Sequence, residues 1–180
     1  YEYRGRLAEE SEQEYGLRVA DELDEEIRRL GPEHVAGFIA ETVGGATAGV
    51  IPPVPGYFKK IREICDNHGI LLILDEVMCG MGRTGTLFAC EQEDISPDMI
   101  CIAKGLGAGY QPIGATLVNE KVFNAFQGGS KIFQHGHTYM GHATACAGAL
   151  AVQRKVKDKN LLPQVRDLGN QLRTMLIEQF

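Results

Sequence analysis

The stretch Ile-Leu-Leu-Ile-Leu-Asp-Glu at residues 70–76 decides how this chain folds. Its apolar residues are continuous, and two carboxylates follow them directly. A strand that is apolar on both sides belongs to a sheet that is covered on both faces, and such sheets are mostly parallel. Residues 70–76 therefore predict a buried strand of a parallel sheet, with Asp75 at its carboxyl end.

Apolar runs and helical patterns alternate along the rest of the chain. Further strands are predicted at 35–41, 99–103 and 113–118. Apolar residues recur at helical spacing over 9–30, 56–69, 142–156 and 161–180. Strands that alternate with helices indicate an α/β protein with a mostly parallel sheet and flanking helices.

The composition excludes several classes of protein. With 44% hydrophobic and 23% charged residues over 180 positions, the chain can form a core, so disorder is excluded. Apolar runs fall short of the roughly 18 residues that a transmembrane helix needs, so we expect no membrane partner. A net charge of -6 argues against a nucleic-acid partner. Five scattered cysteines without a C-x-x-C pair suggest reduced thiols and a cytoplasmic location.

Polar residues follow several predicted strands at the edge where open α/β sheets bind ligands. They are Glu41, Asp75 and Lys104. Because Lys104 follows an apolar run, we expect it to be buried. A lysine amine in such a place can attack a carbonyl and form a Schiff base. The glycines at 105, 107 and 109 would let a bulky cofactor approach the backbone closely.

An aspartate beside such a lysine suggests pyridoxal 5'-phosphate chemistry. A carboxylate like that of Asp75 can hold a protonated pyridine nitrogen by a charge-assisted hydrogen bond. The charged ring then acts as an electron sink for a substrate carbanion. An amine like that of Lys104 can serve as the general base that moves a proton between substrate and cofactor. The two residues therefore suggest a site for this cofactor.

Three segments resemble the class III aminotransferases, which are fold type I pyridoxal phosphate enzymes. Residues 71–85 carry D-E-V followed by G-x-G-R-T-G, residues 97–115 carry A-K-G, and residues 135–145 read HGHTYMGHATA. The loop GVIPPVPGYF at 49–58 and the run HGHTYMGH are most similar to the ω-amino acid:pyruvate branch. The resemblance extends from about Glu9 to the C-terminus.

The resemblance implies roles for the residues around the cofactor ring. Lys104 would form the Schiff base with the cofactor, and Asp75 would pair with its pyridine nitrogen. Val77 would pack against the ring, and Met78 would also touch the cofactor pocket. Lys104 and Asp75 are therefore the expected catalytic residues. Thr42 departs from the family pattern, because many members have proline at its position.

The resemblance also implies partners and a reaction. The expected enzyme transfers an amino group from an ω-amino acid or amine to a 2-oxo acid such as pyruvate. Thr138 would reach across a homodimer interface to the phosphate of the neighbouring subunit's cofactor. Glu41 would lie at the mouth of the site, where it would help to gate substrate carboxylates.

Family members are more than twice as long as this chain. Residues 1–180 therefore correspond to part of the large domain, without the N-terminal phosphate-binding segment and the C-terminal small domain. By itself, such a chain is expected to bind cofactor weakly and to turn over poorly. The alternatives are an inactive fragment or degenerate homologue, or an aminomutase or decarboxylating transaminase. His135, His137 and His142 form H-x-H-x4-H, but no carboxylate or cysteine lies at ligand spacing, so we expect no metal site.

Overall fold

The computed structural model describes residues 5–47 and 49–180. Four strands form one sheet in the order β1 (Gly37–Glu41), β2 (Leu71–Asp75), β3 (Met99–Ile102) and β4 (Ala115–Val118). The first three strands are parallel, and β4 runs antiparallel to β3. The predicted α/β class with a mostly parallel sheet is confirmed.

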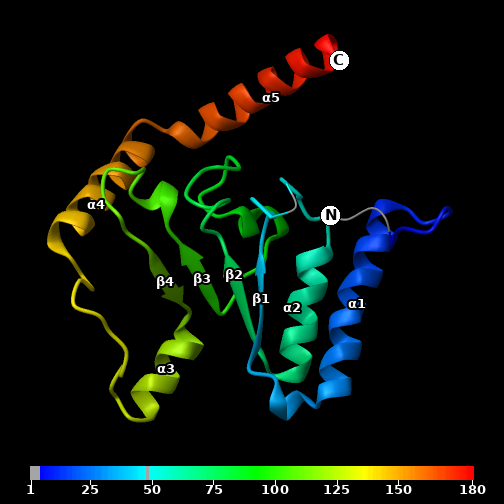
Figure 1. Cartoon of the computed structure of the whole chain (residues 1–180), viewed down its shortest axis with the longest axis horizontal. Helices are drawn as coiled ribbons and strands as arrows, with labels where there is room; N and C mark the ends of the chain where they lie inside the picture. The colour runs from blue at the N-terminus through cyan, green and yellow to red at the C-terminus, as the bar shows by residue number, and fades with distance from the viewer. Residues whose placement is uncertain (1–4, 48) are drawn as a thin grey trace.

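Helices surround this sheet (Figure 1). They are α1 (Glu12–Leu30), α2 (Tyr57–His68), α3 (Glu120–Gly128), α4 (Ala143–Asp158) and α5 (Leu161–Gln179). Short 3-10 helices lie in the connections to the strands: η2 (Pro32–His34) before β1, η3 (Ala89–Glu93) between β2 and β3, and η4 (Lys104–Leu106) between β3 and β4. The helices expected at 9–30, 56–69, 142–156 and 161–180 are present as α1, α2, α4 and α5. Helix α3 was not predicted; it has nine residues and begins where the Asn119 side chain accepts the Val122 N–H.

Helices α1 and α2 pack side by side against one face of the sheet (Figure 1). A capping box begins α1: the Glu14 N–H donates to Ser11 Oγ, and the Ser11 N–H donates to the Glu14 carboxylate. The buried residues that join these two helices to β2 form the core cluster. Its members are Ala20, Ile27, Phe58, Ile61, Ile64, Cys65, Ile70, Leu72, Leu74 and Cys90.

The opposite face of the sheet is more open. Side chains alternate along a strand, so Leu72 and Leu74 point toward the helices while Ile73 points away from them. Ile73 is half-buried, and Ile39 on β1 is 61% exposed. The prediction that the sheet is covered on both faces is wrong for residues 5–47 and 49–180. An apolar strand indicates only that both of its sides are suited to burial, and it does not say which segments cover them.

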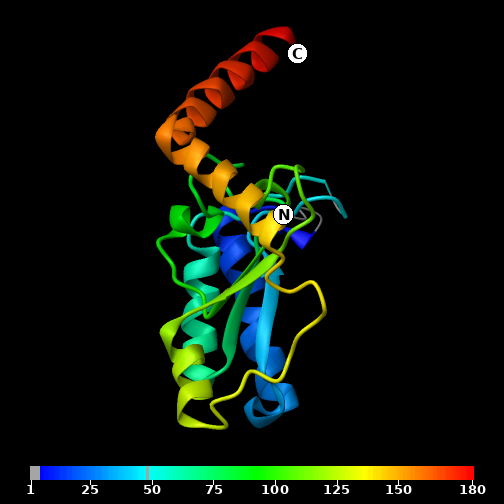
Figure 2. The same ribbon diagram turned by 90° about the vertical axis from the view of Figure 1, so that its left-hand side faces the viewer.

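Helix α5 extends away from the sheet in both views (Figures 1 and 2). Large apolar side chains along it are exposed, including Leu168, Leu172, Met175, Ile177 and Phe180. Within the described ranges, none of the helices combines the length and the apolar character required to cross a bilayer.

A buried carboxylate at Asp98 fixes the end of the sheet that lies away from Asp75. It accepts hydrogen bonds from the Leu72 N–H at 2.8 Å, from Arg62 Nη1 at 2.9 Å and from Asn119 Nδ2 at 3.0 Å. Burial raises the pKa of Asp98, but these hydrogen bonds outweigh it and hold the pKa below its ordinary value. The contacts join β2, α2 and the start of α3 at one point.

Candidate active site

The carboxyl ends of the parallel strands meet in one row of residues. Glu41 pairs in register with Asp75, and Asp75 pairs with Cys101. Thr116 of β4 continues the row beside Cys101, with Sγ and Oγ1 3.9 Å apart. Paired residues on adjacent strands point to the same face. The row therefore lies on the face opposite α1 and α2, and Lys104 follows Cys101 by three residues.

Asp75 has one carboxylate oxygen in use and one available. Its side chain is half-buried, and Oδ1 accepts the Val77 N–H at 2.9 Å. Oδ2 accepts no hydrogen bond from any residue that the structure describes. The contact with Val77 turns the carboxylate toward the loop after β2 and leaves Oδ2 for a further donor.

Lys104 begins η4 in the left-handed region, with φ +38°. Residues other than glycine rarely adopt this conformation, and it is often kept where function requires it. The side chain is exposed and forms no ion pair within residues 5–47 and 49–180. The expectation that Lys104 is buried is therefore wrong for this chain, because the turn after β3 leaves the sheet and no described segment covers the amine.

The loop that follows Asp75 contacts the turn that carries Lys104. A Cβ atom at Gly105 would lie only 2.9 Å from the Met81 Cβ, so the two backbones approach each other closely here. Met81 itself has a positive φ of 55°. Asp75 and Lys104 were predicted to lie at one edge of the sheet, and the close approach of Met81 and Gly105 brings together the segments that carry them.

A buried carboxylate at Glu76 fixes the loop after Asp75. Glu76 is fully buried, and Oε1 accepts the Thr42 hydroxyl at 3.0 Å and the Cys90 N–H at 2.9 Å. Oε2 accepts the Ala89 N–H at 2.7 Å. This role of Glu76 was not predicted from the sequence. The sequence feature that could have indicated it is a second carboxylate directly after a wholly apolar strand, because a buried carboxylate without hydrogen-bond partners is costly.

Glu41 and Met78 lie close together around Gly45. Glu41 Oε2 accepts the Gly45 N–H at 2.7 Å. A Cβ atom at Gly45 would lie 2.9 Å from the Met78 Cγ and 3.0 Å from Glu41 Oε2. Met78 is 42% exposed, whereas Val77 is half-buried. The structure thus brings Glu41 and Met78, two of the predicted site residues, together at the β1 end of the row.

Thr138 lies apart from these residues. It belongs to an exposed turn at 138–141 that precedes α4. The Met140 N–H donates to the His137 carbonyl within this segment at 2.9 Å. No hydrogen bond joins Thr138 to Asp75 or Lys104 in the part of the chain that the structure describes. Over the same residues, no group of three or more histidine, cysteine or acidic side chains is arranged to hold a metal ion.

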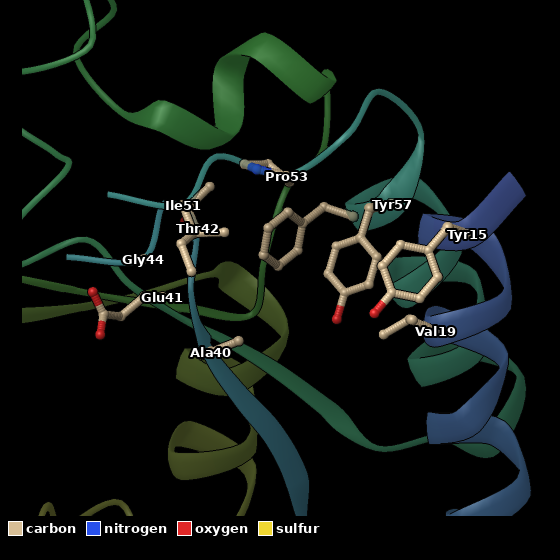
Figure 3. Close-up of a pocket in the computed structure, with 10 residues that line it drawn as sticks. Tyr15, Val19, Ala40, Glu41, Thr42, Gly44, Ile51, Pro53 and Tyr57 are labelled. Carbon is tan, nitrogen blue, oxygen red and sulfur yellow. The ribbon is translucent and has the colours of Figure 1, made fainter. Parts of the chain in front are cut away.

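A separate hollow of about 320 Å³ opens at the end of β1, between the strand and the two helices α1 and α2. Tyr15, Tyr57 and Ile51 are among its lining residues. Figure 3 shows the Glu41 carboxylate pointing away from the two tyrosines. Neither Asp75 nor Lys104 lines this hollow. The hollow therefore shares Glu41 with the row of residues at the strand ends, but not the residues proposed to bind the cofactor.

The arrangement at the strand ends is that of a fold type I cofactor-binding domain, and the chain belongs to the class III aminotransferases. The family model for aminotransferase class-III matches residues 2–179. An aminotransferase of Gibberella zeae is 49% identical over 99% of this chain and 35% of its own length. Gamma aminobutyrate transaminase 2 of Solanum lycopersicum is 45% identical over 92% of this chain and 37% of its own length.

Solved structures show the same fold. An ω-aminotransferase from Paracoccus denitrificans superposes with a TM-score of 0.89 and 38% identity, over 98% of this chain and 40% of its own. The ω-transaminase of Pseudomonas jessenii in complex with PMP gives a TM-score of 0.91 and 38% identity, over 98% of this chain and 39% of its own. The chain thus spans about 35–40% of the length of the relatives that it matches.

Class III aminotransferases depend on pyridoxal 5'-phosphate, and the residues present fit that cofactor. The cofactor needs an amine for its aldehyde and an anionic acceptor for its pyridine nitrogen. Among the described residues, the Lys104 amine forms no ion pair, and Asp75 Oδ2 accepts no hydrogen bond. Both groups are therefore available to the cofactor. The turns that carry the two residues are in contact through Met81 and Gly105. The donor set at this edge therefore matches the cofactor's chemistry.

Proposed function

We propose that this protein transfers an amino group from an ω-amino acid or amine to a 2-oxo acid such as pyruvate. The observation that carries the proposal is the row in which Asp75 pairs with Cys101, three residues before Lys104. The ω-transaminase and gamma-aminobutyrate transaminase relatives support the choice of an ω-amino donor. Residues 1–180 are proposed to be part of the large domain.

The proposed chemistry divides between Lys104 and Asp75. Pyridoxal 5'-phosphate, when bound, supplies an electron sink that lets a substrate C–H bond break. Lys104 binds the cofactor through Nζ. When substrate has displaced it from the cofactor, the Lys104 amine would be the base that holds and moves the proton taken from the substrate carbon. Asp75 Oδ2 would accept a hydrogen bond from the pyridine nitrogen of the cofactor and would favour its protonated form.

The remaining predicted residues have binding roles in this proposal. Val77 and Met78 orient the cofactor ring at the edge that follows Asp75. Glu41 lies at the mouth of the proposed site. A hydrogen bond of 2.7 Å from the Gly45 N–H holds its carboxylate beside Met78. Thr138 binds the phosphate of the cofactor in a partner subunit, which makes the protein a homodimer. The exposed turn that carries Thr138 supports a role outside its own subunit's site.

We also place the protein in the cytoplasm, because all five cysteines are free thiols. The alternatives to this function are an inactive homologue and another class III activity. An aminomutase or a decarboxylating transaminase would use the same lysine and aspartate.

The test uses the product of the complete open reading frame loaded with cofactor, with the 180-residue chain measured in parallel. Pyruvate is offered with β-alanine, 4-aminobutyrate or 1-phenylethylamine, and alanine formation is followed by mass spectrometry. We expect alanine from the complete product, little from the 180-residue chain, and a loss of at least about 1,000-fold in Lys104→Ala. Glutamate is offered separately as an α-amino donor, and alanine formed with glutamate but with none of the other three donors would contradict the proposed substrate class.

A further inference from the structure

A glutamine on α4 contacts the turn that carries Lys104. Gln153 Nε2 donates to the Gly105 carbonyl at 3.2 Å and to the Leu106 carbonyl at 2.9 Å. Both contacts are partly buried, and they join residues that are 47 and 48 positions apart in the sequence. The two carbonyls belong to the residues that directly follow Lys104.

These carbonyls depend on the side chain for their hydrogen bonds. The turn is only three residues long, and its own backbone bonds end on the carbonyls of Ala103 and Lys104. Over the described residues, the carbonyls of Gly105 and Leu106 accept no backbone N–H. Buried or partly buried carbonyls are nearly always paired, and a primary amide has two N–H groups to give. Gln153 therefore completes the turn.

The turn is thus held from two sides. The loop after β2 packs Met81 against Gly105, and α4 supplies Gln153 from the other direction. Helix α4 also lies near Gln111, since a Cβ atom at Gly148 would be in ordinary van der Waals contact with the Gln111 Cγ, at 3.5 Å. Lys104, with φ +38°, needs such support, since a residue in a left-handed conformation persists only where its surroundings fix it.

We propose that Gln153 is a positioning residue for Lys104. Its amide holds the turn so that the Lys104 side chain starts from a fixed backbone direction beside the loop that follows Asp75. The inference rests on the proposed role of Lys104. It also links that lysine to α4, which begins five residues after Thr138.

The test compares three variants of the 180-residue chain. Gln153→Leu removes both donors at similar volume, and Gln153→Glu keeps the shape but presents oxygens to the two carbonyls. Gln164→Leu is the matched control, because the exposed Gln164 Nε2 donates to the Lys159 carbonyl at 3.2 Å on a different helix. Thermal unfolding of each variant establishes that the fold is retained.

Hydrogen exchange measures the turn without any cofactor. We expect the amides of residues 106–108 to exchange about tenfold faster in both Gln153 variants than in the wild type, the factor that corresponds to about one lost hydrogen bond. The Gln164→Leu control should match the wild type at these amides. Equal exchange in all four proteins would overturn the inference.

Lysine reactivity measures the consequence for Lys104. The same substitutions are made in the product of the complete open reading frame. Each protein is incubated with pyridoxal 5'-phosphate over a range of pH and reduced with borohydride, and the rate at Lys104 is divided by the rate at the exposed Lys131. In the wild type we expect Lys104 to react faster than Lys131, and the two rates to depend differently on pH. In the Gln153 variants we expect the ratio of the two rates to be near one. A ratio that is high in the wild type and unchanged in the variants would overturn the inference. A ratio near one in the wild type would instead contradict the proposed function, and hydrogen exchange would still test the contact of Gln153 with the turn.

Discussion

The hydroxyl of Thr42 lies 3.0 Å from Oε1 of Glu76, and both side chains are buried, with 2% and 0% of their surface exposed. Thr42 directly follows Glu41, and Glu76 directly follows Asp75. The hydrogen bond therefore ties together the ends of β1 and β2 at the edge where the proposed site lies. Proline has no hydroxyl, so a proline at position 42 could not form this bond.

Replacing Thr42 by valine tests this bond. Thr42→Val keeps the shape of the side chain but removes the donor to Glu76, so we expect the free energy of unfolding to fall by about 1–2 kcal/mol. Urea denaturation at neutral pH gives the value. Thr144→Val on the exposed start of α4 is the control and should leave stability nearly unchanged. Equal stability of the two variants would show that the hydroxyl contributes nothing.

Gly80 tests the close packing of the loop after Asp75. A Cβ atom at Gly80 would lie 2.7 Å from the Glu76 carbonyl oxygen and 3.0 Å from the Glu76 Cβ. We expect Gly80→Ala to lower stability by about 1–3 kcal/mol, because the backbone must move to make room. Gly128→Ala, whose Cβ would meet nothing within 4 Å, should be neutral or stabilising by up to about 1 kcal/mol. Thermal unfolding that ranked the two variants in the opposite order would contradict this packing.

The pH dependence of stability tests Asp98. Hydrogen bonds from Leu72, Arg62 and Asn119 outweigh burial and hold its folded pKa below the unfolded value. A carboxyl with a depressed pKa stabilises the fold above the unfolded pKa of about 3.9, and this contribution is lost as the pH falls through the folded pKa. We expect Asp98→Asn to cost about 2–4 kcal/mol at pH 7. The gap between variant and wild type should narrow below pH 4 in urea denaturation, and a gap that stayed constant would count against the ionised carboxylate.

Thiol reactivity tests the burial of the cysteines. Burial raises the pKa of Cys90 to about 12, with a further contribution from the Glu76 carboxylate, and burial raises the pKa of Cys65 to about 11. The thiolate is the form that reacts. Iodoacetamide at pH 8.5 should therefore modify the exposed Cys146 while Cys65 and Cys90 stay unmodified until urea unfolds the protein. Rapid native labelling of Cys90 would contradict its burial beside Glu76.

Patterns along the chain predicted the sheet and part of the site. The apolar run before Asp75 and the one before Lys104 indicate strands, and the ends of parallel strands must meet at one edge. Helix α3 was missed because it is short and depends on the Asn119 cap. The contacts of Gln153 with Gly105 and Leu106, and of Glu76 with Thr42 and Ala89, could not be predicted, since their partners are brought together only by the fold.

Lys104 was predicted to be buried but is exposed, again because a local sequence pattern does not report distant contacts. An apolar strand indicates that its own residues are buried, but it does not say where the following turn leads. In this chain the turn leaves the sheet at Lys104, and the amine has no cover among residues 5–47 and 49–180. Burial of a functional side chain depends on segments far away in sequence, which a local pattern does not report.

The most direct test of the account is to identify the lysine that binds the cofactor. The product of the complete open reading frame is loaded with pyridoxal 5'-phosphate, reduced with borohydride, digested and mapped by mass spectrometry. Lys104 is one of eight lysines in residues 1–180. We predict a stoichiometric adduct at Lys104, which Asp75→Asn leaves in place while it slows transamination. A stoichiometric adduct at another lysine, with Lys104 unmodified, would contradict the assignment.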